Sequence, residues 1–170
     1  MYAIVGYVDQ VTESKILGLW KEMRDKDITD YPYQREGHRP HLTFSSFTEP
    51  EPDLLHEIER LSTQAKAVPL RFRLFGSFMK SDSFLLLPDS NNELTELHRK
   101  VLALQSAPSL YTPGIWIPHI TIANHLNPDQ QSAVQQLAQQ RLEPFSGSLI
   151  KLAFIQITEH AVIELKVNFL

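Results

Sequence analysis

Two short stretches of this chain repeat one pattern, and together they constrain its fold more than any other feature. The first is RPHLTFSSFTEP, residues 39–50, and the second is IPHITIANHLNP, residues 117–128. Both carry Pro-His-(Leu or Ile)-Thr, and in both a proline follows nine residues after the histidine. The two histidines, His41 and His119, are 78 residues apart. The fold must therefore accommodate two similar segments, each of which reads as the start of a β-strand.

The same offset of 78 residues aligns further positions without a gap. Identical or apolar residues meet along both segments: Pro40 with Pro118, Thr43 with Thr121, Pro50 with Pro128, Phe72 with Ile150, Leu74 with Leu152 and Phe84 with Val162. Two copies are too few for a solenoid, which needs at least three repeats to bury its faces. We therefore predict an α+β fold: a bilobal, pseudo-twofold duplication with antiparallel sheets, helices packed outside them and a central cleft carrying both His-x-Thr strands.

The duplication also predicts the domain organisation. Residues 1–170 form a single bilobal domain in this reading. One His-x-Thr repeat lies around 40–88 and the second around 118–170, each with a preceding strand–helix unit.

Apolar periodicity and turn residues indicate where the individual elements lie. A helix is expected from Thr12, as its N-cap, to about Lys26, because serine, threonine, aspartate and asparagine favour that position. Strands are expected over residues 2–8, 41–47, 70–79, 83–87, 116–123, 149–158 and 162–169, further helices over 51–63, 91–105 and 128–140, and loops over 27–40 and 106–114.

Composition restricts the class of protein and of ligand. Of 170 residues, 42% are hydrophobic and 21% are charged, which is typical of a soluble globular domain. The net charge of −4 argues against a protein that wraps a long duplex, since such proteins carry a basic excess. There is no cysteine, so disulfides and thiolate chemistry are excluded. With no signal peptide and no apolar run of membrane-spanning length, we expect a cytoplasmic protein that does not engage a membrane.

The paired motifs place reactive side chains together. Successive side chains of a strand point to opposite faces, so His41 and Thr43 share one face, and His119 and Thr121 do likewise. The intervening apolar residues then face the core. Two imidazoles at one site suit acid–base chemistry near neutral pH, and threonine hydroxyls can donate hydrogen bonds to phosphate oxygens. This set fits in-line displacement at a phosphodiester without a metal or other cofactor.

PHLTF and PHITI resemble the paired His-x-(Thr/Ser)-x motifs of the 2H phosphoesterase superfamily, which includes bacterial 2′-5′ RNA ligase-like proteins and cyclic nucleotide phosphodiesterases. The resemblance covers nearly the whole chain. It implies a bilobal α+β fold with His41, Thr43, His119 and Thr121 in a central cleft as catalytic residues. It also implies activity on 2′-5′ or 2′,3′-cyclic phosphate linkages, usually without a metal. Which histidine is the acid and which the base stays open.

Accessory residues are suggested by the loops before each motif. Arg39 directly precedes the first motif and has no cationic equivalent at Ile117. Tyr33 and Tyr111 occupy the loops before the two motifs, where aromatic rings could stack a base. We predict Arg39, Tyr33 and Tyr111 as substrate-binding residues, with ordinary solvated loop residues as the alternative. Trp116 is expected in the core.

The sequence thus supports a metal-independent phosphoesterase acting on RNA ends or small nucleotides. The alternative is a non-catalytic module that holds an RNA end or nucleotide in the same cleft, and a weaker third reading is a metal-dependent hydrolase. The expected partner is a small nucleotide or an RNA terminus and not a long duplex, and we expect a monomer.

Overall fold

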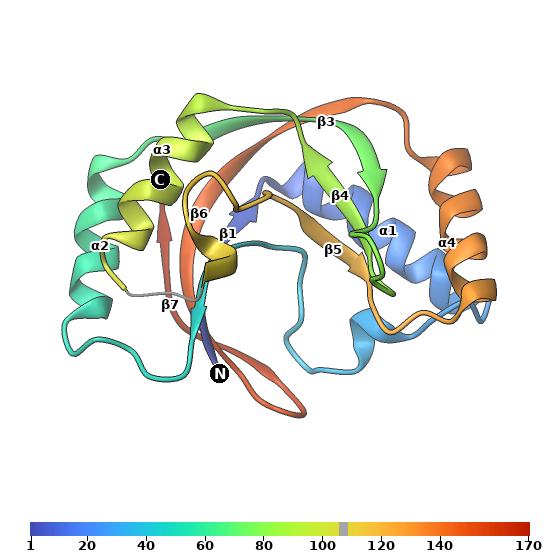
Figure 1. The fold of residues 1–170 in the computed structure, drawn as a ribbon, viewed down its shortest axis with the longest axis horizontal. Coiled ribbons are helices and arrows are strands. Elements are labelled where there is room, and N and C mark those ends of the chain that lie inside the picture. Colours follow the sequence, from blue (N-terminus) through green and yellow to red (C-terminus); the bar gives the residue numbers. More distant parts are fainter. Residues whose placement is uncertain (106–108) are drawn as a thin grey trace.

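The computed structural model describes residues 1–105 and 109–170, so residues 106–108 of the expected loop 106–114 lie outside the described residues. The elements follow one another along the chain as in Figure 1. They are β1 Tyr2–Val8, α1 Gln10–Asp25, β2 Leu42–Phe47, α2 Leu54–Gln64, β3 Val68–Gly76, β4 Phe84–Pro88, α3 Asn92–Leu102, β5 Ile120–Ala123, α4 Pro128–Arg141, β6 Phe145–Ile157 and β7 Val162–Phe169, with short 3-10 turns at Tyr31–Tyr33 and Ser109–Tyr111.

The seven strands of the described residues belong to one antiparallel sheet in the order β1-β2-β5-β4-β3-β6-β7. A further pairing between β1 and β6 closes the first six strands into a ring. The expectation of separate sheets is therefore corrected. The physical reason is the length of β6, whose 13 residues pair with β3 over Phe145–Leu149 and with β1 over Leu149–Gln156.

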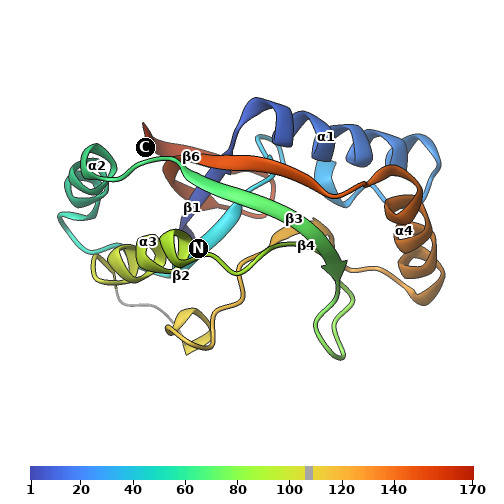
Figure 2. The same cartoon turned by 90° about the horizontal axis from the view of Figure 1, so that it is seen from above.

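The four α-helices found in residues 1–105 and 109–170 pack in two pairs at the two ends of the molecule (Figures 1 and 2). Helix α1 contacts α4, and α2 contacts α3. Each pair thus combines a helix from the first half of the sequence with one from the second. All four helices bury apolar residues in the main core, against the face of the sheet that carries Leu42, Phe44, Ile120 and Ile122. These four strand residues are fully buried, as the alternation predicts.

Helix α1 begins earlier than expected because Asp9, not Thr12, is its N-cap. The Asp9 carboxylate accepts hydrogen bonds from the backbone N–H of Thr12 at 2.9 Å and from its hydroxyl at 3.0 Å. It also accepts one from the backbone N–H of Ser148 in β6. Burial of Asp9 acts to raise the pKa of its carboxyl, but the hydrogen bonds from Thr12 and Ser148 outweigh this and lower it. The cap therefore ties the start of α1 to the long strand.

Strand β5 is shorter than the expected 116–123 and begins at Ile120. The backbone N–H groups of Ile115 and Trp116 both donate to the carbonyl oxygen of Thr112, so this segment forms a turn. Pro118 has no N–H and cannot join a ladder. Helix α3 begins as expected, with the Asn91 side chain accepting hydrogen bonds from the next turn.

The remaining helices and strands lie within a few residues of their predicted positions. Within the described residues, no helix is both long and apolar enough to cross a lipid bilayer.

Candidate active site

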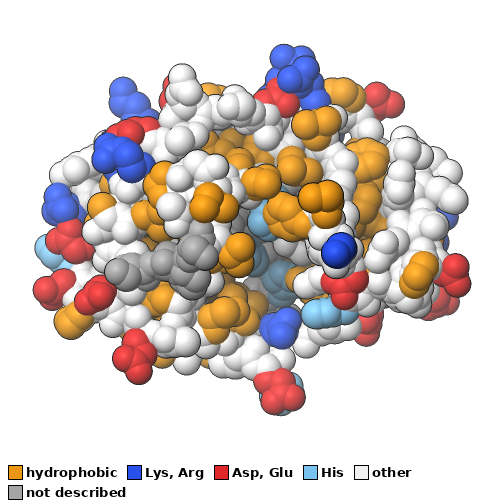
Figure 3. Space-filling view, viewed as in Figure 1, with side chains coloured by type: hydrophobic (Ala, Val, Ile, Leu, Met, Phe, Trp, Pro, Cys, Tyr) orange, Lys and Arg blue, Asp and Glu red, His pale blue; other side chains and the backbone are white. Residues whose placement is uncertain are grey.

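The two His-x-Thr motifs meet where β2 pairs with β5. Leu42 is the partner of Ile120, and both are fully buried on the core side. In the continued antiparallel register, His41 lies opposite Thr121, and Thr43 lies opposite His119. Because side chains alternate, these four residues share the face away from the core. Histidine side chains lie at the bottom of the hollow in the centre of the face drawn in Figure 3.

Each motif histidine is held by the carbonyl group two residues earlier. The Nδ1 atom of His41 lies 2.8 Å from the carbonyl oxygen of Arg39, and that of His119 lies 2.8 Å from the carbonyl oxygen of Ile117. A carbonyl oxygen can only accept a hydrogen bond, so Nδ1 carries the proton in both rings. In the neutral ring this leaves the lone pair on Nε2. The two imidazoles therefore offer the same nitrogen for proton transfer.

Both imidazoles favour the neutral form. Burial lowers the pKa of His41 to about 4; the Arg39 carbonyl opposes the shift, and the nearby His38 and His119 add to it. Burial also lowers the pKa of His119, against the opposing effect of the Ile117 carbonyl. At neutral pH both histidines are therefore uncharged and can act as bases.

The backbone of Thr43 is fixed by the loop that precedes the second motif. The indole N–H of Trp116 donates to the carbonyl oxygen of Thr43 at 3.0 Å. The Trp116 ring stacks on His98 at a centroid distance of 3.8 Å and on Phe44 at 5.6 Å. Trp116 is only partly buried, but it packs against the main core. It thereby links the two motifs mechanically.

Two residues that contact the motif histidines, His38 and Phe78, were not predicted as site residues. His38 lies beside His41 at a ring distance of 5.8 Å and packs against Trp20 and Tyr31 at 5.1 and 5.7 Å. Phe78 meets His119 edge to face at 5.2 Å. His38 had a sequence signal, since it lies three residues before His41 in an aromatic loop. Phe78 lies in the turn after β3, where no pattern marks it.

The Arg39 guanidinium is engaged by acidic residues. It donates to both carboxylate oxygens of Glu13 at 2.9 and 3.0 Å and to Glu164 at 3.2 Å. It also stacks over the Tyr7 ring at 4.2 Å. Substrate binding by Arg39 stays a prediction, and a phosphate would have to compete with these two carboxylates.

The two tyrosines lie in different surroundings. Tyr33 is exposed, and the Arg24 guanidinium lies 4.2 Å from its ring. Tyr111 is closer to the motifs, because its hydroxyl accepts a hydrogen bond at 3.2 Å from Ser46, on the strand that carries Thr43. Their roles in substrate binding also stay predictions.

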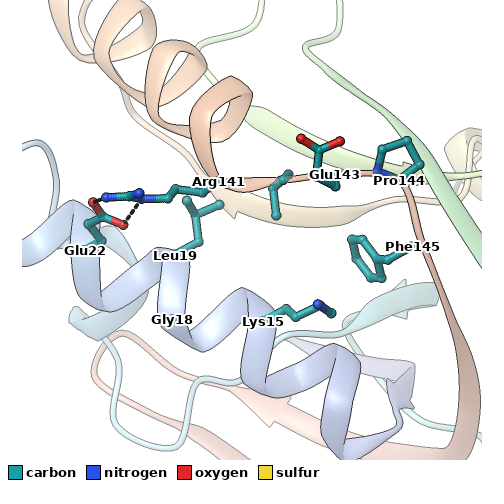
Figure 4. Close-up of a pocket in the computed structure, with 9 residues that line it drawn as sticks. Lys15, Gly18, Leu19, Glu22, Arg141, Glu143, Pro144 and Phe145 are labelled. Carbon is teal, nitrogen blue, oxygen red and sulfur yellow. Dashed lines mark hydrogen bonds and ion pairs between the residues drawn. The ribbon is translucent and has the colours of Figure 1, made fainter.

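A cavity of about 460 Å³ lies elsewhere, between α1 and the link from α4 to β6 (Figure 4). Its Arg141 donates two hydrogen bonds of 2.7 Å to Glu22, and Lys15 lies 5.6 Å from the Phe145 ring. None of the four motif residues lines it. Across the described ranges, no group of three or more histidines and acidic residues is arranged to hold a metal ion.

Comparison with solved structures identifies the fold. A structure described as a phosphoesterase superposes with a TM-score of 0.64 at 14% identity, covering 99% of this chain and 97% of the other. Escherichia coli LigT complexed with 3′-AMP gives the same TM-score, identity and coverages. A protein of Thermus thermophilus gives a TM-score of 0.61 at 15% identity, with coverages of 99% and 97%.

Sequence comparison gives one family. No curated protein matches the sequence significantly. Residues 12–161, which include both motifs, match the sequence profile of the 2′-5′ RNA ligase superfamily. This chain, an α+β protein with an antiparallel sheet and four helices among its described residues, belongs to the 2′-5′ RNA ligase superfamily.

Proposed function

We propose that this protein is a metal-independent phosphoesterase that cleaves 2′,3′-cyclic phosphate or 2′-5′ phosphodiester linkages of RNA ends or small nucleotides. The observation that carries the proposal is the pairing of Leu42 on β2 with Ile120 on β5. Continued by one residue on each side, this register sets each motif histidine opposite a motif threonine. Family membership and the structural relative described as a phosphoesterase support the same chemistry.

The four residues divide the reaction between them. One histidine accepts the proton of the attacking water or hydroxyl through Nε2, and the other donates a proton to the leaving oxygen. The hydroxyls of Thr43 and Thr121 donate hydrogen bonds to the non-bridging oxygens and so stabilise the charge in the transition state. In an in-line displacement the attacking and leaving oxygens lie on opposite sides of phosphorus. Two histidines placed diagonally across a strand pair can each serve one of these oxygens.

The low pKa values of the histidines fit this scheme once the substrate is bound. An acid catalyst must be protonated, and burial of the two rings opposes protonation. A phosphodiester carries a negative charge, which raises the pKa of a neighbouring imidazole. The substrate thus brings the charge that allows one histidine to hold a proton.

The proposed ligand is a small nucleotide or an RNA terminus. The structural relative from Escherichia coli has been solved with 3′-AMP, ATP, NADP⁺ and phosphate. The net charge of −4 of the present chain disfavours long polyanions.

We further propose that the two motifs belong to two repeats of a single bilobal domain, residues 1–170, around 40–88 and 118–170 with a strand–helix unit before each. Exchanging β1, β2 and β3 with β4, β5 and β6 leaves the neighbours within the six-stranded ring unchanged, which supports this. The same exchange replaces α1 by α3 and α2 by α4, and it turns the helix contact α1–α4 into the contact α2–α3. This correspondence matches β4 with β1, so β4, at the end of the first repeat, also serves as the strand that precedes the second repeat.

The function is tested with a panel of 2′,3′-cyclic nucleotides and 2′-5′ dinucleotides, whose products are assigned by phosphorus NMR. We expect wild type to hydrolyse at least one class with EDTA present, and His41→Ala or His119→Ala to lose about 10²–10⁴-fold in kcat. His160→Ala is the matched control, since its side chain is 87% exposed.

Hydrolysis retained by the His41→Ala/His119→Ala double variant would overturn the mechanism. Tight nucleotide binding by wild type without any product would instead favour a binding module, and loss of activity in EDTA would favour a metal-dependent hydrolase.

A further inference from the structure

The cleft face of the sheet continues past His119 as an apolar row. Leu86 is the partner of Ile120, so in the same register Leu87 lies opposite His119. Leu87 is in turn the partner of Leu74 on β3. Side chains directly opposite each other across antiparallel strands are neighbours on one face. On this face of the sheet, His119 is therefore next to Leu87 on β4, and Leu87 is next to Leu74 on β3.

These leucines line a pocket of about 350 Å³. Its other walls are the start of α3 and the loop that precedes the second motif, including Trp116, Ile117 and Pro118. We call this the apolar pocket. No lysine, arginine, aspartate or glutamate lines it among the described residues. Leu74 is 60% exposed and Ile117 is 48% exposed. Figure 3 shows apolar side chains gathered beside the central hollow.

The corresponding space beside His41 is filled. Gly6 is the partner of Leu42, so Tyr7 lies opposite His41. The Tyr7 ring is covered by the Arg39 guanidinium, which is itself held by Glu13 and Glu164. On the His41 side the protein thus supplies its own covering groups, whereas on the His119 side the sheet remains open.

We propose that the apolar pocket binds the nucleobase of the nucleoside that lies on the His119 side of the scissile phosphate. This rests on the proposed function. A base is planar and uncharged and gains from contact with apolar and aromatic walls. A phosphate would find no lysine or arginine among the described residues that line the pocket. In-line displacement also places the two groups linked by the phosphate on opposite sides of the cleft, one of them next to His119 and the pocket.

The proposal predicts a substrate that carries a base on the His119 side of the reacting phosphate. A second base on the other side is allowed but not required. Removing that base removes a stacking contact, which for nucleic-acid-binding proteins corresponds to roughly tenfold in affinity per base. The loss should appear mainly in KM, because the base takes no part in the bond changes at phosphorus.

The test uses 2′-5′ adenylyl-adenosine and two analogues that each lack one of the two adenines. We expect wild type to lose about tenfold in kcat/KM on one analogue only. The Leu74→Ser/Ile117→Ser variant should cleave that analogue and the parent dinucleotide equally well. Serine is chosen because it removes apolar surface without repelling the phosphate. Leu165→Ser, at a leucine 41% exposed on β7, is the control and should behave as wild type.

A second measurement does not depend on turnover. Adenosine is titrated into the protein, and the methyl resonances of Leu74 and Leu87 are followed by NMR. If wild type cleaves nothing but adenosine shifts these methyl resonances, the pocket binds a base and the proposed function is wrong. Cleavage with equal rates on all three substrates, or adenosine shifts confined to other methyls, would reject the pocket while leaving the proposed function standing.

Discussion

Trp116 donates a hydrogen bond from its indole nitrogen to the carbonyl oxygen of Thr43, 73 residues earlier in the chain. The residue that leads into the second motif therefore positions the backbone of the first. Neither partner is a proton-transfer group, yet the bond spans the junction of β2 and β5, where Leu42 and Ile120 form a single residue pair.

Trp116→Phe should impair catalysis more than folding. Phenylalanine keeps much of the stacking on His98 and Phe44 but cannot donate to Thr43. We expect a loss of about 1 kcal/mol in the free energy of unfolding, or roughly 2–4 °C in Tm. The value of kcat should fall several-fold because the two motifs are less well aligned.

The comparison is with a core variant of similar Tm, such as Leu137→Val on α4. A Trp116→Phe protein whose kcat matches that of the core variant would contradict the positioning role.

Replacing the motif threonines distinguishes hydroxyl chemistry from packing. Thr43→Val or Thr121→Val keeps the β-branched shape but removes the donor, and should lower kcat by about 10²-fold, as for the loss of one transition-state hydrogen bond. Thr43→Ser or Thr121→Ser should retain most of the activity. Steady-state kinetics on the best substrate of the panel measures both, and equal activity of the valine and serine variants would exclude a role for the hydroxyl.

The stability of the protein should depend on pH through His41. Its pKa is about 4 in the folded state, below the ordinary histidine value of about 6.5. The unfolded chain therefore binds the proton more readily, so the contribution is present above about pH 6.5 and is lost as the pH falls towards 4. Between pH 7 and pH 5 this amounts to about 2 kcal/mol.

His41→Gln removes the titrating group, and glutamine can still donate to the Arg39 carbonyl. Urea unfolding at pH 7 and pH 5 should show that wild type loses about 2 kcal/mol more than His41→Gln over this range. An equal loss in the two proteins would mean that His41 titrates normally in the folded state.

The N-cap of α1 should contribute measurably to stability. Asp9→Ala removes the acceptor for Thr12 and for Ser148, and we expect a loss of about 1–2 kcal/mol in the free energy of unfolding. Asp25→Ala, at the other end of α1, is the control and should change stability by less than about 0.5 kcal/mol, because its ion pair with Lys21 is exposed. Thermal unfolding of the two variants side by side decides the question.

The alternation of side chains along a strand predicted which motif residues face the core and which face away from it. Alternation alone assigns Leu42 and Ile120 to the core and their flanking histidines and threonines to the opposite face, and the burial agrees. The constant offset of 78 residues predicted that the two strands would be related. The first argument uses only residues within each motif, and the second uses a comparison of the sequence with itself.

Long-range contacts account for what the sequence did not predict. The partners of Arg39 lie 26 and 125 residues away, so no local pattern reveals that its guanidinium is engaged. Thr12 and Asp9 are both good capping residues, and the choice between them depends on Ser148, which is 139 residues from Asp9. The contact of Phe78 with His119 likewise depends on where a turn folds back.

The ring of strands has a consequence for how this protein could be divided. The link from β3 to β4, residues 77–83, separates two runs of the form strand-helix-strand-helix-strand, and each run carries one motif histidine and one motif threonine. Two peptides cut within this link would each hold half of the reactive groups. They would regain the complete set only by associating through β2–β5, β3–β4, β3–β6 and β1–β6. Such a pair would form a split enzyme, in which turnover reports that two separate chains have come together.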